Sequence, residues 1–88
     1  MIAKVTGTVD SVGAGFAVID VGGVGYLVQC SGRTLAGLDV GARASLLTDM
    51  QVREDAIVLY GFADAAEQAC FRMLTGVQGV GGKAALSI

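Results

Sequence analysis

The chain has 88 residues, of which 53% are hydrophobic and 16% charged, and its formal net charge is −2. This length allows one small domain and a fragment of a second, and the apolar composition argues against disorder. With six basic residues against eight acidic ones, no broad basic face can form, so contacts with nucleic acid must be few and rely on backbone N–H groups.

The absence of histidine excludes several kinds of active site, among them Ser/His/Asp and Cys/His arrangements and His-dependent acid–base catalysis. Cys30 and Cys70 lack C-x-x-C spacing, and we expect both to be reduced core residues because a zinc site needs more ligands. No apolar run approaches the roughly 18 to 20 residues of a membrane span, and a signal peptide is absent. We therefore expect a cytoplasmic protein without a membrane partner or a cofactor.

The first half of the chain is patterned as strands. Residues 1–12 are rich in β-branched residues around Gly7, which predicts a strand that bends sharply, as in a small closed barrel. Residues 16–21 and 24–30 flank Gly22-Gly23, and two glycines favour a tight hairpin because its turn needs positive φ. These glycines lack the G-x-G-x-x-G spacing and the following helix of a nucleotide loop.

Two more strands follow a short segment, residues 31–38, in which we expect one helical turn. Residues 57–62 are β-branched and aromatic, and residues 43–52 alternate with period two. The alternation places on one side Ala44, Leu46, Thr48, Met50 and Val52. Five strands with a helical insert between the third and fourth predict a mainly β protein with a five-stranded oligonucleotide/oligosaccharide-binding (OB) barrel over residues 1–62.

Three consecutive charged residues, Arg53, Glu54 and Asp55, separate the last two strands. The simplest interpretation is the tip of a β-hairpin, where charged side chains remain in water.

From Ala63 the period changes to that of a helix. Asp64 and Glu67 have the spacing of a capping box, and the helix should end at Gly76. We expect Gln68 and Arg72 to face away from an apolar stripe that serves as core or subunit contact, made of Ala66, Cys70, Met73 or Leu74, and Val77. A second helix begins at Gly82, and so short a helix is marginal alone, which suggests a longer natural chain.

The glycine cluster before Lys83 allows two functional interpretations. A Walker A loop would need glycine at Val77 and a hydroxyl residue at Ala84, so the sequence argues against intrinsic ATPase activity. A helix-hairpin-helix instead uses a turn such as Gly79-Val80-Gly81, whose backbone can approach a phosphate closely, with Lys83 adding a charge. Such a unit grips the DNA backbone without reading bases. An ordinary glycine-capped turn between helices stays open as the alternative.

Several of these segments, taken in order, resemble the N-terminal part of the bacterial RuvA family. They are the Met1-Ile2 start, residues 20–26 (DVGGVGY), residues 52–56 (VREDA), residues 59–62 (LYGF), and Gly79-Val80-Gly81 with Lys83 and Ala85. The resemblance implies an OB barrel (residues 1–62) followed by the first helix-hairpin-helix (residues 63–88) of an incomplete second domain. This sequence departs from the family pattern at Gly82, where family members commonly have proline.

The resemblance also implies a function: a non-catalytic subunit that binds four-way (Holliday) DNA junctions as a homotetramer, within a branch-migration helicase complex of recombination and repair. It places Glu54 and Asp55 in an acidic pin at the junction centre, and Gly79, Val80, Gly81, Gly82 and Lys83 on backbone phosphates. A C-terminal domain beyond this sequence would engage a RuvB-type ATPase. Arg53 either contacts DNA or neutralises its acidic neighbours.

Two other functions stay open. The chain could chiefly be a structural oligomerisation module with little DNA binding of its own. The second is a barrel that binds single-stranded nucleic acid. Stacking platforms for its bases are not evident, because most of the five aromatic residues fall at positions expected to be buried.

Overall fold

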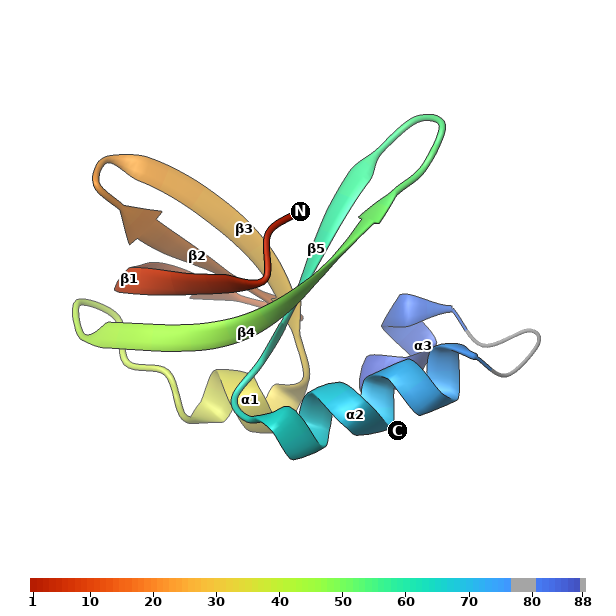
Figure 1. Cartoon of the computed structure of the whole chain (residues 1–88). Coiled ribbons are helices and arrows are strands. Elements are labelled where there is room, and N and C mark those ends of the chain that lie inside the picture. The colour runs from red at the N-terminus through yellow and green to blue at the C-terminus, as the bar shows by residue number, and fades with distance from the viewer. Residues whose placement is uncertain (77–80, 88) are drawn as a thin grey trace.

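The computed structural model describes residues 1–76 and 81–87, which form a β-barrel with short helices beneath it (Figure 1). The strands are β1 (Lys4–Gly13), β2 (Phe16–Val21), β3 (Val24–Cys30), β4 (Arg43–Val52) and β5 (Ile57–Phe62). The helices are α1 (Gly32–Ala36), α2 (Ala65–Thr75) and α3 (Gly82–Ser87). Within the described ranges, no helix has the length and apolar character needed to cross a membrane. The mainly β fold class is confirmed.

The five strands close into a barrel in the order β1-β2-β3-β5-β4, which is the mixed sheet expected of an OB fold. β1 pairs with two strands. Its residues 4–8 pair with β4, and its residues 8–13 pair with β2. Gly7 lies where this change occurs, and a Cβ there would stand 2.2 Å from the backbone oxygen of Asp20. The bend predicted from this glycine therefore depends on a close backbone approach that a side chain would block.

The β2–β3 hairpin turns at Gly22 and Gly23, whose φ angles are 59° and 93°. Positive φ at both central positions confirms the expected tight turn. The Asp20 carboxylate accepts a hydrogen bond of 2.8 Å from the Gly23 N–H, which fixes the turn from within.

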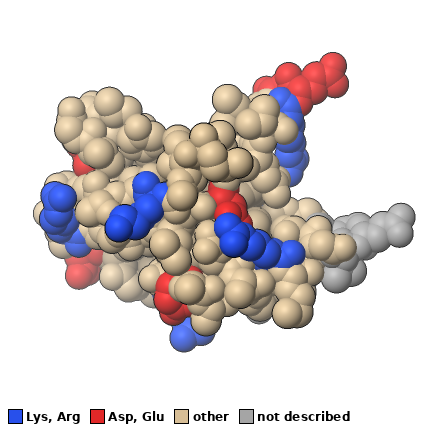
Figure 2. Space-filling model, in the orientation of Figure 1, with Lys and Arg blue, Asp and Glu red and all other residues tan. Residues whose placement is uncertain are grey.

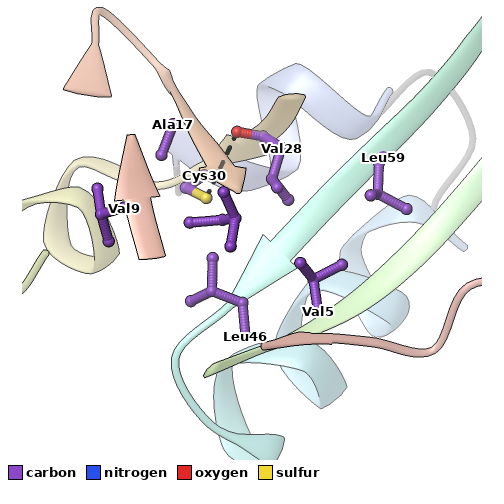
Figure 3. Close-up of a cluster of buried hydrophobic side chains, with 8 residues drawn as sticks. Val5, Val9, Ala17, Val28, Cys30, Leu46 and Leu59 are labelled. Carbon is purple, nitrogen blue, oxygen red and sulfur yellow. Dashed lines mark hydrogen bonds between the residues drawn. The ribbon is translucent and has the colours of Figure 1, made fainter. Parts of the chain in front are cut away.

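The barrel interior is filled by small and branched side chains that converge from different strands (Figure 3). Its buried members are Val5, Val9, Ala17, Ile19, Val28, Cys30, Leu46 and Leu59. Thr48 is buried on the same side, and its hydroxyl donates to the Ile2 carbonyl at 2.7 Å. Gly61 also belongs here, because a Cβ at this position would lie 2.5 Å from Cγ1 of Val28. The alternation predicted for β4 is confirmed in the barrel.

A second cluster joins the helices to the outside of β5. Phe71 of α2 packs against Tyr60 and Phe62, with ring centroids 4.9 Å apart in both pairs. Ala85 of α3 is buried in the same cluster. The helical segment is thus seated on the barrel through aromatic side chains of its last strand.

The prediction that the apolar stripe of α2 packs in the core was wrong, whereas its alternative role as a subunit contact stays a prediction. Ala66, Cys70 and Met73 are exposed, and of the expected stripe only Leu74 packs on the second cluster, whereas Val77 lies outside the described residues. The helix is rotated because the bulky Phe71 occupies the space over Tyr60 and Phe62. Cys70 is consequently not a core residue, although Cys30 is buried as expected. Gln68 and Arg72 lie away from this stripe as predicted, but they face the barrel, since both donate to Asp49 of β4.

Candidate nucleic-acid interface

The hairpin formed by β4 and β5 extends beyond the barrel as a two-stranded ribbon (Figure 1). β4 leaves its ladder with β1 at Leu47, and β5 pairs with β3 only at Tyr60 and Gly61. Towards the tip, residues 50–52 of β4 and residues 57–59 of β5 pair with each other alone. The ribbon therefore holds its connecting turn away from the barrel wall.

The turn at the end of this ribbon carries the three charged residues. Arg53, Glu54 and Asp55 are all exposed, and the Arg53 N–H donates to the Ala56 carbonyl at 2.7 Å. The Arg53 guanidinium also donates to Oε1 of Gln51 at 3.0 Å, so it folds back along the strand. Figure 2 shows acidic side chains at the extremity of the molecule with a basic one behind them. The acids thus occupy the most protruding position of the ribbon.

The predicted phosphate-binding turn is described only in part. Gly79 and Val80 lie outside the described residues, whereas Gly81 is exposed and immediately precedes α3. The Gly81 carbonyl accepts a hydrogen bond of 2.9 Å from Ala85 N–H, which begins the helix. Lys83 is exposed in the first turn of α3.

Gly82 is buried against Tyr60, and a Cβ at this position would lie 2.3 Å from the tyrosine hydroxyl oxygen. A glycine at the start of α3 therefore has a packing reason here: it lets the helix begin directly on the aromatic ring. The helical segment consequently has fixed contact with β5, the strand that also leads to the acidic tip.

A polar network anchors α2 at its first turn. Asp64 caps the helix by accepting from Glu67 N–H at 2.8 Å, as the capping box predicts. The Glu67 carboxylate accepts from Ala63 N–H at 3.0 Å, and also from the hydroxyls of Ser31 at 2.6 Å and Thr34 at 2.5 Å. Burial by itself would raise the pKa of Glu67, but these hydrogen bonds outweigh it and hold the pKa below 4.5.

Further along α2, Arg72 forms a bidentate ion pair with Asp49, at 3.0 Å from Nε and 2.7 Å from the second nitrogen. The Asp49 hydrogen bonds raise the pKa of Arg72. The Glu67 network therefore fixes the first turn of α2 to α1, and the Arg72–Asp49 pair fixes its last part to β4. Sequence reasoning missed the contacts of Glu67 with α1 and of Arg72 with Asp49, because these partners lie 23 to 36 residues away in the chain.

The two predicted DNA-contacting regions occupy different places on the chain. The acidic tip stands at the end of the ribbon, whereas α3 lies beside α2 near the base of the ribbon, in contact with Tyr60 of β5 (Figure 1). The structure does not bring them into one pocket. Among the described residues, no group of three or more His, Cys, Asp or Glu side chains could hold a metal ion. The arrangement presents separated surfaces of the kind that contact a large ligand.

Comparisons with known proteins point to one family. Residues 1–61 match the family described as the RuvA N terminal domain. A relative from Paramagnetospirillum magneticum is 57% identical over 88 residues, covering 100% of this chain and 42% of its own length. Relatives from Sphingopyxis alaskensis and Rhodospirillum centenum are 61% and 57% identical, and the match covers 45% and 43% of their lengths. All three are named Holliday junction branch migration complex subunit RuvA. The chain spans less than half the length of these curated relatives.

Proposed function

Because the chain belongs to the RuvA family, we propose that it takes part in the structure-selective binding of four-way DNA junctions, as the non-catalytic subunit of a branch-migration complex. The observation that carries the proposal is the exposed pair Glu54 and Asp55 at the end of a protruding ribbon. A cytoplasmic location fits a protein whose ligand is DNA. A RuvB-type ATPase would be engaged by parts of the protein beyond this chain.

The proposed role of Glu54 and Asp55 is to repel phosphates at the crossover. Two unit charges 4 Å apart repel by roughly 1 kcal/mol in water, and by more where water is excluded. Four copies around a fourfold axis would collect eight such carboxylates at one centre. A continuous duplex placed there would bring its backbone against them, whereas a junction parts its strands at that point.

The proposed role of residues 79–83 is to hold the outer arms by their backbone. Gly79, Val80, Gly81, Gly82 and Lys83 would offer N–H groups and one positive charge to a phosphate. Residues 63–88 would then be the first helix-hairpin-helix of a second DNA-binding domain, following the barrel of residues 1–62. The exposure of Gly81 and Lys83 supports this assignment. Arg53, folded back onto Gln51, is assigned to partial neutralisation of the tip.

Charge removal at the tip tests the first role. The chain with Glu54→Gln and Asp55→Asn should keep or gain affinity for DNA while its preference for a synthetic four-way junction over duplex falls in a competition assay. A matched control neutralises two exposed acids elsewhere, Asp10 and Asp39. Equal loss of preference in the control, or unchanged preference in the tip variant, would contradict the role.

Salt dependence tests the second role. Lys83→Ala should weaken binding to all junction sequences alike and reduce the slope of log K against log salt by about 0.9 for each phosphate that the variant no longer neutralises. Lys4→Ala, which removes an exposed charge from β1, is the control. A weakening that depends on base sequence would show that Lys83 does not bind the backbone.

A second candidate function is a structural oligomerisation module. It is favoured by the exposed α2 face of Ala66, Cys70 and Met73, the last with 76% of its surface accessible. Sedimentation of the chain with and without a four-way junction separates the two candidates. A homotetramer that also binds the junction supports the proposal, and a tetramer that ignores DNA supports the structural module.

A further inference from the structure

The ribbon carries an apolar pair directly behind its acidic tip. Val52 and Ile57 face each other as cross-strand partners, and 68% and 70% of their surfaces are exposed. By alternation they continue the row of Met50 and Leu59, which packs in the barrel interior. The row that forms the core inside the barrel therefore runs on into solvent.

Strand formation does not require these two residues to be apolar. β-Branched side chains favour strands, but threonine provides that preference without exposing two aliphatic surfaces. Elsewhere in the described part of the chain, the same row of the sheet is covered by other strands. Packing of the barrel therefore does not explain why these two exposed side chains are apolar. They also lie beside the tip, where the proposed function places the crossover.

We propose that Val52 and Ile57 contact the faces of the base pairs that border the crossover, an inference that rests on the proposed junction binding. Each arm of an open junction ends in a base pair with one face that lacks a stacking neighbour. An apolar side chain can cover such a face, as the apolar wedges of architectural proteins do between base steps. Glu54 and Asp55 keep phosphates away from the tip, so base faces are the part of DNA that matches an apolar surface beside two acids.

This assignment separates two roles within the six residues from Val52 to Ile57. The acids repel the charged backbone, whereas Val52 and Ile57 stabilise the complex with DNA whose base-pair faces are exposed. Duplex DNA offers no free face at its interior, so the pair would add to junction preference without reading sequence. The ligand we propose for this pair is the face of a base pair, and the alternative is the ribbon of a second copy of the chain.

The test uses the chain with Val52→Thr and Ile57→Thr, which keeps β-branching at both positions and removes apolar surface. The matched control is Val24→Thr with Val40→Thr, since these side chains are 56% and 65% exposed but lie off the ribbon. Junctions carry 2-aminopurine either beside the crossover or in an outer arm, and fluorescence and affinity are measured together. Far-UV circular dichroism checks that each variant is folded, and Ile57→Phe provides a variant with more apolar surface.

The wild-type chain and the control should change the fluorescence of the probe beside the crossover and leave the outer probe unchanged. The double threonine variant should lose that change and bind the junction about fourfold more weakly for each methyl group that no longer covers a base. Ile57→Phe should enlarge the change.

Wild-type binding with a crossover signal that survives in the threonine variant would overturn this inference and leave the proposed function intact. If the wild-type chain shows no preference for the junction, both fail. A threonine variant that sediments as a smaller species than wild type without DNA would show that the pair joins copies of the chain, which also overturns the inference.

Discussion

The Glu67 network makes a prediction that can be worked through in detail. Glu67→Gln keeps the length of the side chain but removes its charge and replaces one acceptor oxygen with an amide that faces the Ser31 or Thr34 hydroxyl. A hydrogen bond to a charged group contributes about 1.5–3 kcal/mol when buried. Glu67 is only partly buried, so screening reduces this, and we expect the variant to lose about 1–2 kcal/mol in total. For a domain of this size the melting temperature should fall by roughly 5–15 °C.

The pH dependence of this loss identifies its cause. The folded-state pKa of Glu67 lies below 4.5, so its stabilisation is fully present above that pH and is lost as pH falls through the folded-state value. Urea unfolding of wild type and variant should therefore differ at neutral pH and converge as pH falls below the folded-state pKa of Glu67, where the wild-type carboxyl also becomes neutral. A difference in unfolding free energy between wild type and variant that is the same at all pH values, or no difference at neutral pH, would refute the argument. Glu54→Gln removes the same charge at an exposed site and should change stability by less than about 0.5 kcal/mol.

Three further outcomes follow from packing and ion pairing. Gly61→Ala should cost about 1–3 kcal/mol in urea unfolding, because its Cβ would overlap the side chain of Val28. Arg72→Ala should lower the melting temperature at low salt, and the difference should shrink at high salt because the pair with Asp49 is exposed. Cys70 should react readily with a thiol reagent, whereas Cys30, whose burial raises its pKa to about 12, should react only on unfolding; two equally fast thiols would contradict its burial.

The strands and turns could be predicted because their signals are local. Gly22-Gly23 needs only its own positive φ angles to define the hairpin, and Asp64 needs only the N–H of Glu67 to begin α2. The alternation of residues 43–52 likewise gave the correct inward side of β4. Each of these features is determined by residues only a few positions apart in the chain, so a local sequence pattern is sufficient to predict it.

The prediction of the buried face of α2 failed because two faces of this helix have apolar side chains. Ala66, Cys70 and Met73 form one stripe, and Phe71 with Leu74 forms another. The choice depends on Tyr60 and Phe62, which stand on β5 and favour the larger aromatic partner. No local pattern contains that information.

Val52 shows a different limit of sequence reasoning. Its side of β4 was correctly predicted, but the side that is buried at Leu46 is exposed at Val52 because the barrel ends between them. Alternation identifies a face of a strand and does not say how far the covering layer extends. The exposed pair could be recognised only after the ladders of β1 and β3 were known to stop short of the tip.

Placement of the two proposed DNA contacts depends on one strand. β5 begins beside the acidic tip at Ile57, seats Gly82 on Tyr60, and packs Phe62 against α2. Repulsion at the tip and attraction at residues 81–83 would therefore act at a separation set by packed secondary structure. DNA can accommodate the repulsion and the attraction together only if its phosphate backbone is absent at the acidic tip and present at the turn before α3, a fixed distance away. That requirement concerns the shape of DNA and not its base sequence, which is why junction selectivity follows more naturally from this fold than sequence recognition does.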